Sequence, residues 1–140
     1  MRGVHNSLAS AMPNHHQVDL PTTPIDERTR PNRVELTPLS FLERAAYAFG
    51  GRTAVVHREQ RYTYHDLRRR VHRLASALVA AGIEPGDRVA VLAPNSPVLL
   101  ESHFGVPLAG AVLVAINTRL ASEEIAYILQ HSGAKILLAA

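Results

Sequence analysis

The stretch from Val89 to Leu120 constrains the fold most, because it predicts a strand, a helix and a second strand in succession. Its first five residues are apolar and partly β-branched, which is typical of a strand buried on both faces of a parallel sheet. Ser96 and Pro97 predict a helix start, because Ser caps free N–H groups and Pro is tolerated at the first helical position. Pro107 predicts the end of that helix. The stretch is therefore a βαβ unit, whose crossover is almost always right-handed.

Local patterns on both sides of this unit predict further elements of an α/β protein. Amphipathic spacing and caps predict helices at 37–49, 64–81 and 123–131, and apolar or alternating runs predict strands at 53–57, 61–63, 111–116 and 135–140. The expected N-caps are Ser40, with Glu43 completing a capping box, then Thr63 and Ser122. The fold class expected is βαβ layers of a mostly parallel sheet.

Composition excludes several classes of protein. The chain has 140 residues, enough for one domain, and its net charge of +3 is a mild excess without the interleaved aromatic residues of a nucleic-acid-binding surface. There is no cysteine, so disulfides and Cys-based zinc sites are excluded. No apolar run approaches the roughly 20 residues that span a bilayer, and no secretory signal begins the chain. We expect a cytoplasmic protein with no transmembrane segment and no nucleic-acid partner.

The first 36 residues differ in composition from the rest. Five of the nine prolines fall within residues 1–38, and no helical or strand period runs through them. We expect residues 1–36 to form a disordered Pro-rich leader, and residues 37–140 to form a partial domain. His15 and His16 are adjacent, but neither a Cys nor a His-x-x-x-His pair accompanies them, so a solvated tail is favoured over a metal site.

Several short motifs resemble the N-terminal region of the acyl-adenylate-forming enzymes, which include the AMP-forming acyl-CoA synthetases. The motifs are Gly86-Asp87-Arg88-Val89, Pro94-Asn95, Ala109-Gly110-Ala111-Val112, Asn117 and Arg119-Leu120. The run from His103 to Leu113 resembles most the medium-chain and aromatic acyl-activating branch, and the likeness extends from about Leu36 to the end. The resemblance implies a ligase that joins a carboxylic or fatty acid to CoA, with ATP and magnesium as cofactors, releasing AMP and pyrophosphate.

The resemblance also implies where the chemistry lies. The phosphate-binding Ser/Thr/Gly-rich loop, the Tyr-Gly-x-Thr-Glu segment, the ribose-binding Asp and the catalytic Lys of that family normally follow the region represented here. We therefore expect no catalytic, cofactor-binding or metal-binding residue in this chain. Other nucleotide motifs are missing too: the turn at 93–96 contains no glycine, and Gly105 to Gly110 lacks the Lys-Ser/Thr of a P-loop.

Two groups of side chains leave alternatives open. The helix at 64–81 carries a basic cluster, Arg68, Arg69, Arg70, His72 and Arg73, which could contact phosphate or CoA. A solvated helix face is the favoured interpretation. The histidines are scattered over different elements, although His103 on an apolar helix invites a search for a buried partner.

Two hypotheses about function follow. The first is a piece of an acyl-CoA ligase that is inactive alone, because a buried-type strand at the end of the chain without a covering helix is unusual for a complete domain. The second is a non-catalytic module that binds a partner chain or a small ligand through a sheet edge. In either case, strands that are apolar on both faces predict exposed apolar surface and self-association.

Overall fold

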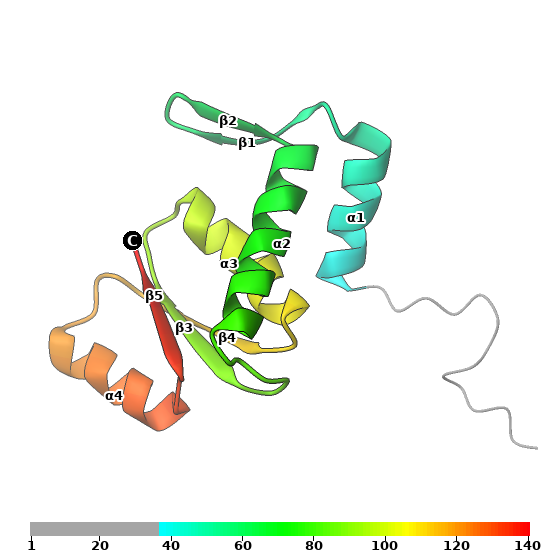
Figure 1. Ribbon diagram of the computed structural model, residues 1–140. Helices are drawn as coiled ribbons and strands as arrows, with labels where there is room; N and C mark the ends of the chain where they lie inside the picture. Colours follow the sequence, from blue (N-terminus) through cyan, green and yellow to red (C-terminus); the bar gives the residue numbers. More distant parts are fainter. Residues whose placement is uncertain (1–36) are drawn as a thin grey trace, which may run out of the picture. The chain divides into compact units, whose positions relative to one another are not determined.

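A computed structural model describes residues 37–140 of the protein, and the expected leader at 1–36, with its paired histidines, lies outside the described residues. Each expected helix and strand is present, with its bounds within one residue of the prediction (Figure 1). The α/β prediction is confirmed. The elements in chain order are α1 (Pro38–Phe49), β1 (Thr53–His57), β2 (Gln60–Thr63), α2 (Tyr64–Ala80), β3 (Arg88–Leu92), α3 (Pro97–Leu108), β4 (Val112–Ile116), α4 (Ser122–Ser132) and β5 (Ile136–Ala139).

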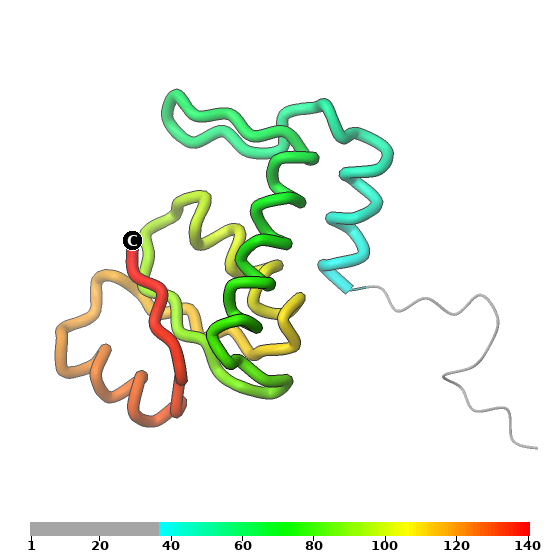
Figure 2. The backbone as a smooth tube through the Cα atoms, viewed as in Figure 1, coloured from blue at the N-terminus to red at the C-terminus, as the bar shows by residue number. Residues whose placement is uncertain are grey.

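The strands form two separate sheets within residues 37–140. β1 and β2 make an antiparallel hairpin that turns at Arg58, whose φ of 55° lies in the left-handed region. β3, β4 and β5 make a parallel sheet in the order β4-β3-β5, so that Val89 of β3 pairs with Leu113 on one side and Ile136 on the other. The chain therefore ends in a strand directly beside β3 (Figure 2).

The strand order places the helices on both faces of the sheet. From β3 the chain crosses to one edge through α3, and from that edge it returns past β3 to the other edge through α4. Because crossovers between parallel strands are right-handed, two crossovers in opposite directions put α3 and α4 on opposite faces. Figure 1 shows α2 and α3 on one face and α4 on the other.

The face beneath α2 and α3 holds the main core. Its buried members come from both helices, from β3 and from the connecting turns: Ala75, Leu78, Ile83, Val89, Val106, Ala109 and Ala111. The two helices approach closely at Gly105, where an added Cβ would lie 2.8 Å from Leu74 Cδ2. Glycine at this position is therefore a packing requirement, since a side chain would force α2 and α3 apart.

The face beneath α4 is covered much less. Ile125, Ile128 and Leu129 were expected to face inward, but they are only half-buried and α4 has no fully buried residue. The expectation of a buried strand at 135–140 is also wrong, because within residues 37–140 β5 pairs with β3 alone and its residues are alternately half-buried and exposed. A strand at the edge of a sheet lacks the second neighbour that would bury it.

The helix caps correct two details of the sequence interpretation. α1 begins at Pro38 and not after Ser40: Thr37 Oγ1 accepts the Ser40 N–H at 3.3 Å, and Ser40 Oγ accepts the Thr37 N–H at 3.2 Å. Likewise Ser122 is the first residue of α4 and not its cap, and the preceding Ala121 N–H donates to Glu124 Oε2 at 2.8 Å. Threonine before a proline is the stronger start signal because Pro favours the first helical position.

The cap of α2 and its termination agree with the prediction. Thr63 and Asp66 satisfy each other's backbone N–H groups at 3.0 and 3.1 Å, which completes a capping box. At the other end Gly82 has a φ of 86°, and the Ile83 N–H returns to the Leu78 carbonyl at 3.1 Å. This Schellman turn buries Ile83 against the core and directs the chain toward β3.

Candidate functional site

A crevice lies at the carboxyl ends of β3 and β4. The loop after β3 leads to α3 on one face of the sheet, while the loop after β4 leads to α4 on the opposite face. Loops that diverge in this way leave a gap, which is the usual position of ligands in open α/β sheets. The gap has a volume of about 520 Å³, and its lining residues are Ala93, Pro94, Asn95, Leu99, Ala115, Ile116, Asn117, Thr118 and Arg119. We call it the β3–β4 crevice.

The polar side of the β3–β4 crevice is built by the loop after β4. Asn117 Oδ1 accepts the Arg119 N–H at 3.0 Å, which fixes an Asx turn directly after the strand. The Asn117 amide group, the Thr118 hydroxyl and the Arg119 guanidinium all belong to exposed residues of this turn. Among the described residues that line the crevice, Arg119 is the only charged one. The polar side of the crevice thus combines one cation with amide and hydroxyl groups, which can both donate and accept hydrogen bonds.

The tertiary structure brings together motifs that are far apart in the sequence. Pro94 and Asn95 follow β3, Asn117 and Arg119 follow β4, and all four line the β3–β4 crevice. The Ala-Gly-Ala-Val run has a different role: Gly110, with a φ of 80°, ends α3, and its carbonyl accepts the Gly86 N–H at 2.9 Å. The motifs that follow β3 and β4 therefore line a surface site, whereas the Ala-Gly-Ala-Val run shapes the backbone at the end of α3.

Ser96 occupies the N-cap position of α3 as expected, but it does not act as a cap. Its φ and ψ of −145° and 166° suit a cap, yet its hydroxyl accepts no hydrogen bond from the helix. The Ser96 Oγ atom is buried and has no hydrogen-bond partner among the described residues. The first N–H groups of α3 therefore lack the side-chain acceptor that usually satisfies them.

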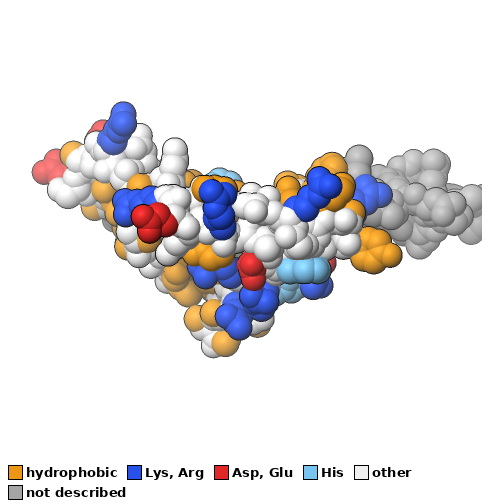
Figure 3. Space-filling view, turned by 90° about the horizontal axis from the view of Figure 1, so that it is seen from above, with side chains coloured by type: hydrophobic (Ala, Val, Ile, Leu, Met, Phe, Trp, Pro, Cys, Tyr) orange, Lys and Arg blue, Asp and Glu red, His pale blue; other side chains and the backbone are white. Residues whose placement is uncertain are grey.

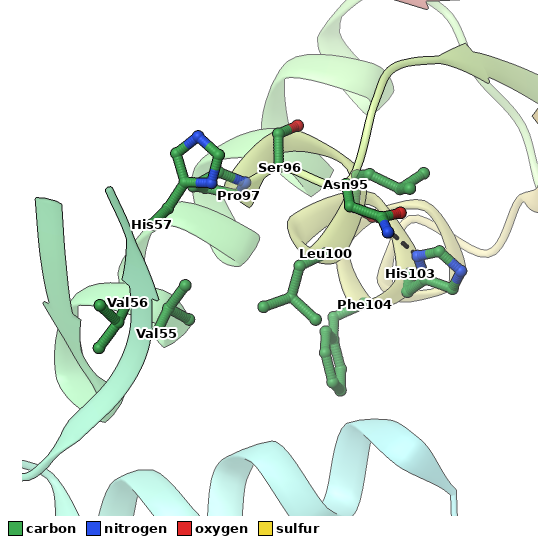
Figure 4. Close-up of a pocket in the computed structure, with 10 residues that line it drawn as sticks. Val55, Val56, His57, Asn95, Ser96, Pro97, Leu100, His103 and Phe104 are labelled. Carbon is green, nitrogen blue, oxygen red and sulfur yellow. Dashed lines mark hydrogen bonds between the residues drawn. The ribbon is translucent and has the colours of Figure 1, made fainter. Parts of the chain in front are cut away.

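An apolar groove adjoins the crevice. It has a volume of about 490 Å³ and lies between β1 and α3, with lining residues Val55, Val56, His57, Asn95, Ser96, Pro97, Leu99, Leu100, His103 and Phe104. Figure 4 shows Leu100 and Phe104 of α3 pointing into the space that faces Val55 of β1. Val55 and Phe104 also pack on the buried cluster of Leu42, Leu67 and Val71, so the floor of the groove is supported from below.

His103, which the sequence singled out, stands at the rim of this groove. Its residue is exposed, and its Nδ1 lies 2.7 Å from the Leu99 carbonyl oxygen one turn earlier. Since a carbonyl only accepts, Nδ1 carries the hydrogen. The partner of His103 is therefore a backbone carbonyl of the same helix and not a buried side chain.

The basic residues of α2 are mostly engaged in ion pairs within the fold. Glu43 of α1 accepts from Arg68 Nε at 2.6 Å and lies 2.8 Å from His72 Nε2, and Arg69 pairs with Asp66 at 2.5 Å. The contact with His72, together with Arg68, lowers the pKa of the Glu43 carboxyl. Basic and acidic side chains are interspersed on the face shown in Figure 3. The prediction that the basic residues of α2 form a solvated helix face therefore omits the ion pairs that they make within the fold.

Arg70 and Glu101 form a contact that the sequence did not suggest. Arg70 Nε donates to Glu101 Oε1 at 2.5 Å, and its guanidinium lies 4.8 Å from the centre of the Tyr62 ring. The hydrogen bond to Glu101 raises the pKa of Arg70. Glu101 is only 7% exposed. The sequence signal that could have indicated this pair was a single carboxylate on a mostly apolar helix, because a buried charge requires a partner.

The only lysine of the chain is also paired. Lys135 Nζ lies 2.8 Å from Asp87 Oδ2, which accepts the Glu84 N–H at 2.8 Å as well. The bond to Lys135, followed by the bond from the Glu84 N–H, lowers the pKa of Asp87. The pair joins the start of β5 to the turn before β3, so both residues have structural roles here.

Within residues 37–140, no three His, Asp or Glu side chains lie close enough together to hold a metal ion. In the same part of the chain no helix is both long enough and apolar enough to cross a membrane.

Comparison with known families decides what the chain is. The family model described as AMP-binding enzyme matches residues 42–140, which include every element from α2 to β5. The chain belongs to the AMP-binding enzyme family. The predicted resemblance is therefore confirmed, and the alternative of an unrelated non-catalytic module is not favoured.

Individual members of the AMP-binding family give the same result. The chain is 50% identical over 106 residues to the peroxisomal trans-cinnamate:CoA ligase of Petunia hybrida, covering 76% of this chain and 19% of that protein. It is 43% identical over 120 residues to the peroxisomal acetate/butyrate–CoA ligase AAE7 of Arabidopsis thaliana, covering 86% and 20%. Among solved structures, the fatty acyl CoA synthetase of Mycobacterium tuberculosis is 38% identical with a TM-score of 0.68, covering 71% and 20%. The chain thus spans about a fifth of the length of these relatives.

Proposed function

We propose that this chain is part of an AMP-forming acid–thiol ligase, which converts a carboxylic acid, ATP and CoA to acyl-CoA, AMP and pyrophosphate. The observation that carries the proposal is the family match over residues 42–140, together with relatives that are named CoA ligases. Their names specify cinnamate, acetate and butyrate, so the proposed acid extends to aromatic and short-chain carboxylates, beside the fatty acids that the resemblance implies.

The proposal assigns the chemical step to groups other than residues 37–140. Activation of a carboxylate needs donors on the α-phosphate, a metal on the leaving pyrophosphate and a positive charge near the reacting centre. The residues described do not fit that set: Lys135 is held by Asp87, and Arg119 is the single charge in the β3–β4 crevice. We therefore propose that the 140 residues alone form no acyl-adenylate, and that ATP and magnesium are held elsewhere in such a ligase.

The test is acid-dependent exchange of labelled pyrophosphate into ATP by the 140-residue chain. The acids are acetate, butyrate, octanoate, palmitate, benzoate and cinnamate, and the positive control is the trans-cinnamate:CoA ligase under the same conditions. We expect exchange above the no-protein background only in the positive control. Exchange by the chain that is lost in a Lys135→Gln variant would overturn the assignment of the chemistry to other residues.

The proposal includes a cytoplasmic location. Two of the relatives described above carry the word peroxisomal in their names, so a peroxisomal location is the alternative to be tested. Fluorescence of the chain fused to a reporter at its N-terminus, compared with a peroxisomal marker in plant cells, distinguishes diffuse from punctate signal. A punctate signal that overlaps the marker would contradict the cytoplasmic proposal.

We also propose that the chain self-associates through the sheet face beneath α4. Val112 is 51% and Leu137 is 42% exposed on this face, and β4 and β5 each pair with β3 alone within the described residues. Apolar side chains beside open strand edges favour association. Sedimentation velocity across a range of concentrations should detect oligomers that Leu137→Lys weakens and Val79→Lys, a change at an exposed position of α2, does not. A monomer at all concentrations would contradict the proposal.

A further inference from the structure

Three elements of the fold meet at the side chain of Arg70. Arg70 belongs to α2, and its Nε donates to Glu101 Oε1 of α3 at 2.5 Å. Its guanidinium carbon also lies 4.8 Å from the centre of the Tyr62 ring, which belongs to β2. The side chain of Glu101 is 9% exposed, so the carboxylate that holds the guanidinium is itself fixed in the packed part of the molecule. One side chain of α2 therefore contacts both the hairpin of β1 and β2 and helix α3.

The same hairpin and the same helix form the two walls of the apolar groove. Val55 of β1 lines one wall and Leu100 of α3 lines the other, and Figure 4 shows the two side chains facing each other. Val55 pairs with Tyr62 across the hairpin, and residues that pair in this way point to the same side of the strands. Leu100 directly precedes Glu101 in the chain. Arg70 thus links two residues that each stand beside a wall of the groove.

The groove is open although both of its walls are apolar. Leu100 is 37% exposed and Val56, on the opposite wall, is 55% exposed, and the hollow between the walls has a volume of about 490 Å³. Burial of apolar surface is favourable and non-directional, so it favours closing of the two walls and does not set a distance between them. An open groove therefore requires contacts of fixed geometry between the hairpin and α3.

The contacts of Arg70 have such a geometry. A guanidinium is planar: its N–H groups bind a carboxylate in the plane, while its face packs on an aromatic ring. Glu101 receives the N–H of Arg70, and Tyr62 packs on the guanidinium. The two partners consequently contact different sides of one rigid group, which keeps the elements that carry them at a constant separation.

We propose that Arg70 is a positioning residue that holds the β1–β2 hairpin and α3 at the separation that keeps the apolar groove open. Glu101 acts on the hairpin through Arg70, because among the described residues the hydrogen bond of its side chain goes to that arginine. Removal of the Glu101 charge should therefore loosen a strand pair on the other side of Arg70. The inference goes beyond the ligase proposal and does not depend on it, because it involves neither a ligand nor a chemical step.

The first experiment measures amide hydrogen exchange of the 140-residue chain by NMR. Glu101→Gln keeps the size of the side chain and removes its charge. It should accelerate exchange of the β1 and β2 amides about twofold to fivefold more than exchange of the Val89 amide, since the hairpin loses the support of an oriented cation–π contact. Val89 is fully buried and reports opening of the whole domain. Equal acceleration at Val89 and in the hairpin would overturn the proposal, because the pair would then stabilise the fold as a whole.

Glu43→Gln is the matched control for this experiment. Glu43 also binds an arginine of α2, but its partner is Arg68 and it lies on α1. The change should leave hairpin exchange as in the original chain. Acceleration of the hairpin by Glu43→Gln as large as that caused by Glu101→Gln would contradict a specific role of Arg70.

The second experiment is a double-mutant cycle with the same readout. Arg70→Met keeps an apolar stem and removes the guanidinium, so it should accelerate hairpin exchange at least as much as Glu101→Gln does. Adding Glu101→Gln to Arg70→Met should change the hairpin no further, because the carboxylate then has no guanidinium to hold. A second acceleration of similar size would show that Glu101 acts on the hairpin by another route and would overturn the proposal.

The third experiment measures the separation itself. The chain contains no cysteine, so Glu59→Cys in the hairpin turn and His103→Cys on α3, both at exposed positions, carry spin labels at unique sites. The distribution of distances between the labels, measured by electron paramagnetic resonance, should be broader when Arg70→Met is added. Arg69→Met, which removes a neighbouring arginine paired with Asp66, should leave the distribution unchanged. An unchanged distribution in the Arg70→Met protein would overturn the proposal.

Discussion

The two faces of the parallel sheet differ in how completely they are covered. On the face beneath α2 and α3, Val89 and Val106 are fully buried, and two helices share the cover. On the face beneath α4, no residue of the helix is fully buried and Leu137 remains exposed. The two faces are built from similarly apolar strands. The difference therefore arises from the number of helices on each face and not from the hydrophobicity of the strands.

This difference has a consequence for stability. Burial of an apolar side chain contributes in proportion to the area removed from water, so the α2–α3 face should supply most of the free energy of unfolding of residues 37–140. The α4 face has the lower density of buried contacts, which is the property of segments that open locally. Three changes test this contrast, from the largest expected effect to the smallest.

The first prediction compares a leucine from each face. Leu78→Ala should lower the free energy of unfolding by about 2–4 kcal/mol, because Leu78 is 3% exposed and its removal leaves a cavity in the main core. Leu129→Ala, at a half-buried position of α4, should cost about 1 kcal/mol or less. Urea unfolding followed by circular dichroism measures both. Equal losses would mean that the α4 face is covered in solution, for example by a second copy of the chain.

The second prediction concerns ion pairs, and it sharpens the contrast by asking what else stabilises the α2–α3 face. Glu101→Gln should cost about 1–2 kcal/mol, since it leaves the partly buried Arg70 without its anion. Glu43→Gln is the matched control, because that carboxylate is 46% exposed and pairs with exposed Arg68, so its loss should cost about 0.5 kcal/mol or less. A larger loss for Glu43→Gln would place the important pair between α1 and α2.

The third prediction concerns β5 and the pH. Because Lys135 and the Glu84 N–H hold the pKa of Asp87 below its ordinary value of 3.8, the folded state binds the proton less readily than the unfolded state does. The stability that Asp87 contributes is therefore present above pH 3.8 and is lost as the pH falls below that value.

Hydrogen exchange of the β5 amides, corrected for intrinsic rates, measures this effect. The original chain should lose protection at β5 as the pH falls below 3.8 and should keep it above that value, and Asp87→Asn should start lower and change less. Glu59→Gln, in the exposed hairpin turn, is the control and should behave as the original chain does. The same pH dependence in all three proteins would contradict a role of the Asp87–Lys135 pair.

Some features followed from the sequence because they depend on residues close together in the chain. The Thr63–Asp66 capping box, the Schellman turn at Gly82 and the break near Pro107 each involve residues at most five positions apart, and all three are present. The same locality allowed the family resemblance to be recognised from short motifs. The shift of the first cap from Ser40 to Thr37 is an error of the same local kind, since two cap signals three residues apart competed and Pro38 favoured the earlier one.

Other features depended on residues that meet only in the folded chain. The order β4-β3-β5 makes β5 an edge strand and puts α4 on the less covered face, although the sequence of β5 is as apolar as that of a central strand. The Arg70–Glu101 pair joins positions 31 residues apart, and the β3–β4 crevice joins two loops that follow different strands. Hydrophobic pattern specifies that a strand has apolar faces, but which side chains remain exposed and which charges pair is decided by the neighbours that the topology supplies.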